Sequence, residues 1–271
     1  MTAAGGQSEN GRSENMEAVA WQLLEQATDR DIKLRLTGSL AVRHHCHTWG
    51  SAMSDLGRRP PRDIDLAGYW SQRKAIASLF ESQGFRLDPA IAQAQEYGIK
   101  RFVYEHPDDG VKVDVFMDEL VMAHTISYRD RLELSAPTLP VTDLLLSKLQ
   151  VHEMTANDLV DMTILFLEHE TSDSPQPDVI DCLQVADILR NDWGFWYEAM
   201  QNLDRVEHAL AGYPHFGDQD RSVAQCAIAD LRTALVETPK SARWKLRARF
   251  GDRVRYWEEV DEVHRKEPDQ I

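Results

Sequence analysis

Two aspartates separated by one apolar residue constrain this chain more than any other feature. The segment Asp63-Ile64-Asp65-Leu66 alternates acidic and apolar side chains, and a period of two is typical of a β-strand with one buried face. Asp63 and Asp65 therefore project from the same face, while Ile64 and Leu66 enter the core. Two carboxylates this close repel each other unless a cation lies between them. An isolated Asp-x-Asp is common on strands, so its meaning depends on what surrounds it.

A glycine–serine pair precedes these aspartates. Gly38-Ser39 follows a short predicted strand at residues 33–37 and opens a predicted helix. Glycine at such a turn lets the backbone approach a ligand closely, and the start of a helix offers free N–H groups to an anion. Ser39 adds a hydroxyl that can contact phosphate. The alternative is that Ser39 only caps the helix.

A third acid lies on a later predicted strand. Residues 99–104 and 111–117 flank the turn sequence Pro107-Asp108-Asp109-Gly110, which predicts a β-hairpin. If the second hairpin strand lies beside residues 63–67, Asp114 joins Asp63 and Asp65. Carboxylate and phosphate oxygens are the ligands that Mg²⁺ prefers, and three acids with two metal ions make a clamp for attack on a phosphate.

The remaining pattern divides the chain into a mixed first half and a helical second half. Residues 1–15 are polar and predict a disordered tail. Residues 16–135 predict an α/β domain, and residues 136–271 predict helices without strand signals. The expected fold class is α+β, a mixed sheet flanked by helices followed by an all-helical domain. Additional predicted elements are helices at 16–27, 71–83, 141–153 and 156–170, a strand at 85–87 and an edge strand at 132–134.

The order strand, Gly-Ser, helix, Asp-x-Asp strand and hairpin with a third Asp resembles the nucleotidyltransferase superfamily, which has the DNA-polymerase-beta-like fold. The resemblance spans residues 33–117 and implies a nucleotidyltransferase-like sheet. It implies that Asp63, Asp65 and Asp114 are catalytic and bind two Mg²⁺ ions, or Mn²⁺ in their place. It also implies that Gly38 and Ser39 bind the triphosphate of an NTP such as ATP.

The helical half resembles the AbiEii-type branch of that superfamily, which includes toxins of toxin–antitoxin pairs. The resemblance lies in Asp143-Leu144-Leu145-Leu146-Ser147-Lys148-Leu149 and in Asn157-Asp158-Leu159-Val160-Asp161. It implies that Lys148 meets nucleotide phosphates and that Asp158 and Asp161 lie at the same nucleotide-binding cleft. Asn157 departs from the pattern, since a basic residue usually precedes this first aspartate. The alternatives are a solvated lysine and an ordinary acidic helix face.

Charge is distributed unevenly along the chain. The net charge is −15, yet residues 240–257 contain seven basic residues and one acid, so that this segment carries +6 and the remainder −21. Bases interleaved with aromatics suit a nucleic-acid backbone, but they also describe the polar face of an amphipathic helix. The candidate RNA contacts are Arg243, Lys245, Arg247, Arg249 and Arg253.

The resemblance leads to three hypotheses about function. The first is transfer of a nucleoside monophosphate from an NTP to a small-molecule acceptor, which the acidic charge favours, because RNA binding draws on basic surface. The second is an AbiEii-like toxin that modifies tRNA, and the third a nucleotide-binding protein without catalysis. Three scattered cysteines, no signal-like start and no long apolar run predict a cytoplasmic protein that does not enter the membrane.

Overall fold

A five-stranded mixed sheet organises the first half of the protein. The computed structural model describes residues 9–50, 53–95, 99–174 and 176–259. The strands lie in the order β1-β2-β5-β4-β3, so the strand bearing Asp114 lies next to the strand bearing Asp65. The bounds are β1 Leu34–Thr37, β2 Ile64–Gly68, β3 Arg86–Leu87, β4 Arg101–Glu105 and β5 Lys112–Met117.

The register of these strands decides which side chains meet. β1 pairs with β2 in antiparallel fashion, and β2 pairs with β5 in parallel, with Asp65 directly opposite Asp114. β4 is antiparallel to β5, which confirms the predicted hairpin. Because neighbours across a ladder point to the same face, Thr37, Asp65, Asp114 and Val103 share one face of the sheet.

Helices cover both faces of the sheet. Helices α1 (Glu9–Asp29) and α3 (Arg73–Ser82) contact each other, and α1 packs against β1 and β2. Ile64 and Leu66 point toward this side and are fully buried. On the aspartate side, α2 (Gly38–His45) packs against β2 and against α5 (Val141–Leu149).

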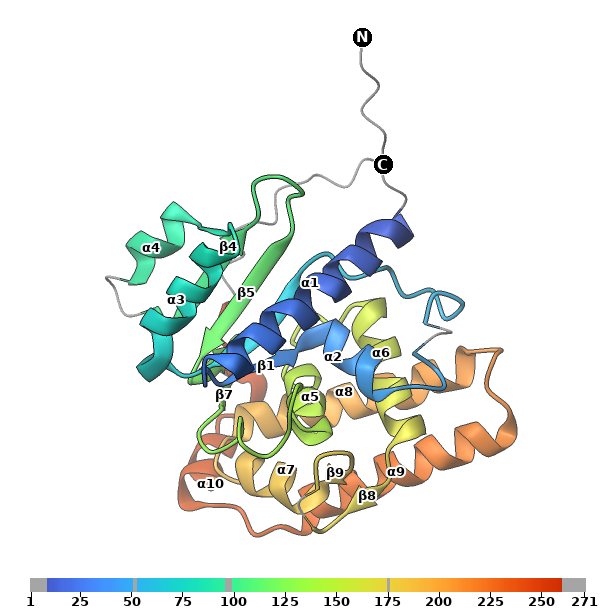
Figure 1. The fold of residues 1–271 in the computed structure, drawn as a ribbon. Helices are drawn as coiled ribbons and strands as arrows, with labels where there is room; N and C mark the ends of the chain where they lie inside the picture. Colours follow the sequence, from blue (N-terminus) through green and yellow to red (C-terminus); the bar gives the residue numbers. More distant parts are fainter. Residues whose placement is uncertain (1–8, 51–52, 96–98, 175, 260–271) are drawn as a thin grey trace, which may run out of the picture.

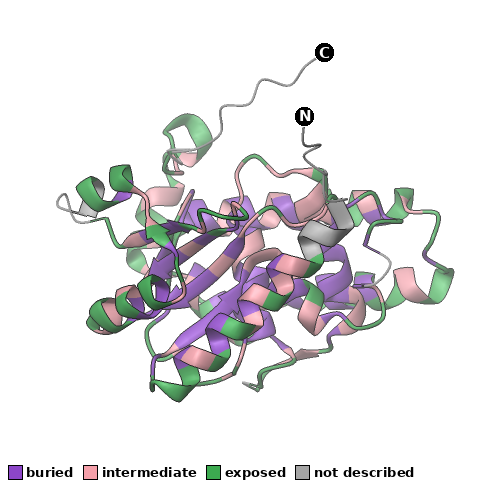
Figure 2. Ribbon diagram, turned by 45° about the horizontal axis from the view of Figure 1, so that its top comes forward, coloured by how far each residue is buried: buried purple, intermediate pink, exposed green. Residues whose placement is uncertain are grey.

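The second half is a cluster of helices joined to the sheet through a common core (Figure 1). Leu36 of β1 exchanges backbone hydrogen bonds with Pro137 and Leu139, immediately after the predicted boundary. The buried apolar residues of the sheet and of the helices belong to one cluster, and Figure 2 shows buried segments in both strands and helices. The two predicted parts therefore share one core. The helices are α6 Ala156–Glu168, α7 Cys182–Leu189, α8 Trp193–Gly212, α9 Asp218–Glu237 and α10 Ala242–Ala248.

Several elements differ from the sequence prediction. Helix α1 begins at Glu9, so that residues 9–15 of the predicted tail are helical, while residues 1–8 lie outside the described residues. The predicted edge strand at 132–134 is wrong, because these residues form turns. A small hairpin precedes them instead. The elements not predicted are α4 Pro89–Gln95, β6 Glu119–Val121, β7 Thr125–Ser127 and the two-residue pair β8 Thr171–Ser172 and β9 Ile180–Asp181.

Candidate nucleotide and metal site

The three predicted catalytic acids come together at one place on the sheet. Asp65 and Asp114 are partners in the β2–β5 ladder. Asp63 immediately precedes β2 and, two residues before Asp65, points to the same side. All three are half-buried. The sheet therefore presents three carboxylates on one face, as the Asp-x-Asp spacing and the hairpin predict.

The electrostatic setting of Asp63 and Asp65 favours their neutral forms. Burial raises the pKa of Asp65 well above its ordinary value, and the neighbouring Asp63 and Asp114 raise it further. Burial and Asp114 likewise raise the pKa of Asp63. The positive charges of Lys148 and Arg101 oppose both shifts. The site thus holds more negative charge than its own cations neutralise.

Gly38 lies against one of these carboxylates. Its φ of +64° is in the left-handed region, and a Cβ at this position would lie 2.1 Å from Oδ2 of Asp65. Only glycine accommodates both the turn and this contact. Ser39, in the first turn of α2, is half-buried beside it. The predicted Gly-Ser turn therefore directs the start of α2 toward the acids.

Lys148 reaches the same site from α5. Its Nζ lies 2.9 Å from Oδ1 of Asp158 and 2.8 Å from Oδ2 of Asp161. Burial acts to lower the pKa of Lys148, but Asp161 and Asp158 outweigh it and raise the pKa above its ordinary value. Its charge also acts on Asp63 and Asp65. Lys148 is therefore a permanent cation next to the three acids.

Asp158 and Asp161 are the two acids that contact Lys148. Asp161 is fully buried. Two guanidinium nitrogens of Arg58 donate hydrogen bonds to its carboxylate, with Nη2 3.0 Å from Oδ2. Asp158 accepts hydrogen bonds from the backbone N–H and the hydroxyl of Thr155, forming a capping box at the start of α6. Both acids were predicted to bind nucleotide. In this structure their carboxylates orient Lys148 and anchor the loop that carries Arg58.

Arg101 is the site residue that sequence reasoning missed. Its Nη2 lies 2.7 Å from Oδ2 of Asp114, and its guanidinium carbon lies 5.2 Å from the centre of the Phe116 ring. The only available signal was register: Arg101 pairs with Phe116, two residues beyond Asp114 on the same face. That register depends on the hairpin, which spacing alone does not fix.

The residues present offer oxygen atoms of the kind that a divalent metal ion takes as ligands. Oδ1 of Asp114 is buried and has no hydrogen-bond partner within the described part of the chain, and carboxylate oxygens are the ligands Mg²⁺ prefers. With every acid ionised, five carboxylates face three cations here, which leaves two formal negative charges. These are Asp63, Asp65, Asp114, Asp158 and Asp161 against Arg58, Arg101 and Lys148. Among the described residues, however, no three His, Cys, Asp or Glu side chains are already arranged to hold one ion.

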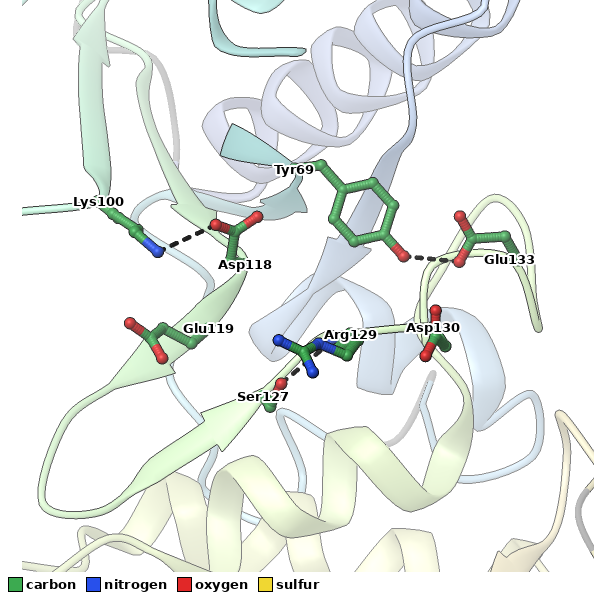
Figure 3. A pocket seen from close by; sticks show the side chains of 8 residues that line it. All are labelled: Tyr69, Lys100, Asp118, Glu119, Ser127, Arg129, Asp130 and Glu133. Atoms are coloured by element: carbon green, nitrogen blue, oxygen red, sulfur yellow. Dashed lines mark hydrogen bonds and ion pairs between the residues drawn. The ribbon is translucent and has the colours of Figure 1, made fainter. Parts of the chain in front are cut away.

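A separate cavity of about 420 Å³ lies at the carboxyl ends of β2 and β5 (Figure 3). Lys100 pairs with Asp118 at 3.1 Å, and the Tyr69 hydroxyl donates to Glu133 at 2.6 Å. A strand rise of about 3.3 Å per residue places Tyr69 roughly 13 Å along β2 from Asp65. None of the predicted site residues lines this cavity.

The basic carboxyl-terminal segment divides into a structural part and an exposed part. Arg247 donates to the carbonyls of Gly251 and Val254 at 2.8 and 2.7 Å and lies over the Trp193 ring. It therefore holds the segment against α8. The other four predicted RNA contacts are exposed: Arg243, Lys245, Arg249 and Arg253.

Comparisons with protein-family models and with curated proteins found no match to this chain. None of the helices in the described residues has both the length and the apolar character that crossing a bilayer requires.

Replacing Gly38 with alanine should damage the site specifically. We expect Gly38→Ala to lower the free energy of unfolding by more than 1 kcal/mol, since a left-handed non-glycine residue costs roughly that much and the new methyl group collides with Asp65. Gly110→Ala is the matched control, because Gly110 has a φ of +68° but open space around it. Equal losses in urea denaturation of the two variants would contradict the proposed contact.

Removing the charge of Asp65 should stabilise the metal-free protein. A carboxyl group whose folded-state pKa is raised favours folding at low pH, and this contribution disappears as the pH rises through the folded-state pKa. At pH 7.5 the ionised group opposes folding, so Asp65→Asn should raise the melting temperature by a few degrees, as a change of about 1 kcal/mol does in a chain of this size.

The gain from Asp65→Asn should shrink as the pH is lowered through the raised pKa. Asp108→Asn, an exposed change in the β4–β5 turn, should leave the melting temperature unchanged at every pH. Thermal melts from pH 4 to 8 supply the measurement. A lower melting temperature for Asp65→Asn than for wild type throughout that range would show that the ionised carboxylate stabilises the fold.

Proposed function

We propose that this protein is a Mg²⁺-dependent nucleotidyltransferase with a nucleotidyltransferase-like fold, which moves a nucleoside monophosphate from an NTP to an acceptor hydroxyl or phosphate. One observation carries the proposal: Asp65 and Asp114 are ladder partners, with Asp63 on the same side, in a setting short of positive charge. Carboxylates crowded in this way are typical of sites that bind a cation.

The residues around the three acids would provide the contacts to the triphosphate. Ser39 and the first N–H groups of α2 would contact the phosphates, since α2 begins at Gly38, which lies against Asp65 of the acidic site. Lys148 adds a fixed positive charge, held in place by Asp158 and Asp161. Such pre-positioned charge stabilises the phosphoryl group as it is transferred.

The proposed reaction forms one bond and breaks one. The acceptor oxygen would attack the α-phosphorus, the bond from that phosphorus to pyrophosphate would break, and the proton of an acceptor hydroxyl would pass to the carboxylate of Asp114. Bound Mg²⁺ supplies charge neutralisation and alignment of the attacking and leaving oxygens. A small acceptor suits the chain, since the net charge outside residues 240–257 is −21.

Removing the acids should abolish nucleotide binding that depends on the metal. We expect Asp63→Asn combined with Asp65→Asn to reduce the affinity for a non-hydrolysable NTP in Mg²⁺ at least tenfold, with Asp108→Asn unchanged. Isothermal titration calorimetry measures this, and circular dichroism shows whether the double variant is folded. Unchanged affinity in the double variant would remove the central claim. Binding without pyrophosphate release from any NTP would favour the non-catalytic alternative.

The exposed basic residues favour tRNA as the alternative acceptor. Arg243, Lys245, Arg249 and Arg253 lie near the exposed apolar side chain of Phe250, a mixture that suits stacking and phosphate contact. The opposing argument is the negative charge of the rest of the chain, which repels a long polyanion wherever it extends beyond this segment.

We expect no strong tRNA binding by this segment. If it did bind, changing Arg243, Lys245, Arg249 and Arg253 to glutamine would flatten the log–log salt dependence by about two to three units, at about 0.7 per phosphate contact. Arg247 stays unchanged, since it holds the segment in place. Gel-shift titrations at two salt concentrations compare the variant with wild type. Submicromolar binding lost in the variant would establish the tRNA alternative.

A further inference from the structure

Arg101 holds one oxygen of the third carboxylate, Asp114. It reaches across from β4 and donates to Oδ2 of Asp114 at 2.7 Å. Its positive charge also acts on Asp63 and Asp65. The arginine is therefore a counter-ion to all three acids in the metal-free protein.

The described residues hold no three acids arranged around one ion, and Arg101 engages part of Asp114. Of the two oxygens of Asp114, Oδ2 is bound to Arg101 and Oδ1 is buried without a hydrogen-bond partner in the described ranges. A metal ion held by Asp65 and Asp114 would place its positive charge close to the guanidinium of Arg101. Two positive charges bound to the same carboxylate repel each other, so a metal ion and Arg101 would compete for Asp114.

We propose that Arg101 is an internal cation that leaves Asp114 when the metal–nucleotide complex binds, and then contacts the phosphates of the nucleotide. This inference rests on the function proposed above and adds a catalytic residue that the family resemblance did not supply. No covalent step is involved: one ion pair is exchanged for another.

The surroundings of Arg101 permit this exchange. The guanidinium lies over the Phe116 ring, 5.2 Å from its centre, and an aromatic face supports a cation without fixing its direction. The Arg101 side chain is 30% exposed, whereas that of Asp114 is 15% exposed, so the arginine is on the open side of the pair. A guanidinium there is suited to phosphate oxygens, which it binds through two parallel hydrogen bonds.

Measuring metal and nucleotide separately tests the exchange. Without nucleotide, we expect Arg101→Gln to bind Mn²⁺ about tenfold more tightly than wild type, because the competing charge has gone. With Mg²⁺ and a non-hydrolysable NTP, we expect the same variant to bind the nucleotide about tenfold more weakly, because the phosphates lose a charged partner. Titration calorimetry measures both affinities.

The neighbouring lysine supplies the matched control. Lys100→Gln removes one positive charge a single residue away, but Lys100 pairs with Asp118 in the other cavity, so it should change neither affinity. Arg101→Lys keeps the charge and loses the planar fork, and it should lie between wild type and Arg101→Gln in both titrations. Thermal melts of all variants show that the comparison is between folded proteins.

The outcomes separate the inference from the proposed function. Opposite shifts of the two affinities in Arg101→Gln, absent in Lys100→Gln, support the exchange. If wild type binds Mn²⁺ through Asp114, shown by its loss in Asp114→Asn, and Arg101→Gln binds it equally well, the exchange is wrong and the metal site stands. If the folded wild type binds neither Mn²⁺ nor a metal–NTP complex, both the inference and the proposed function are wrong.

Discussion

The parallel pairing of β2 with β5 is the constraint on which the site depends. It brings Asp65 directly opposite Asp114, and the half-buried setting makes their repulsion costly. The surrounding residues reduce that cost: Arg101 binds Asp114, and Lys148 brings a second positive charge toward the pair. The site remains negative nevertheless. A fold that retains such an imbalance is less stable than it would be with neutral side chains, which is typical of functional sites.

Asp161 connects this chemistry to the helical half. It receives Arg58 from the loop before β2 and Lys148 from α5, so one buried carboxylate joins three segments that are distant in sequence. Removing one partner of a buried ion pair costs about 3–5 kcal/mol. The network therefore fixes the lysine with respect to the sheet. The common core fixes the helices themselves with respect to the sheet. The packing therefore continues across the predicted boundary near residue 135.

Local sequence patterns predicted the strands of the sheet, whereas the ion pairs are visible only in the folded structure. Alternation and turn residues predicted β2, β5 and the hairpin, because these signals lie within a few residues of each other. The contacts Arg58–Asp161 and Lys148–Asp158 join different elements, the first across 103 positions. Spacing carries no information about such pairs. The same limit applies to the short hairpin of β6 and β7, which has too few residues to show a period.

The charges of the site also determine the form in which a ligand can enter. Under the proposed function, a free triphosphate would approach carboxylates that outnumber their cations by two when every acid is ionised, and it would be repelled. A free divalent ion would meet Arg101 on Asp114 and would be repelled from that acid. A metal–nucleotide complex would avoid both costs, because the metal would neutralise the acids while the phosphates received the arginine. The proposal therefore favours binding of the complex over binding of either component alone, since each component would remove the repulsion that the other meets.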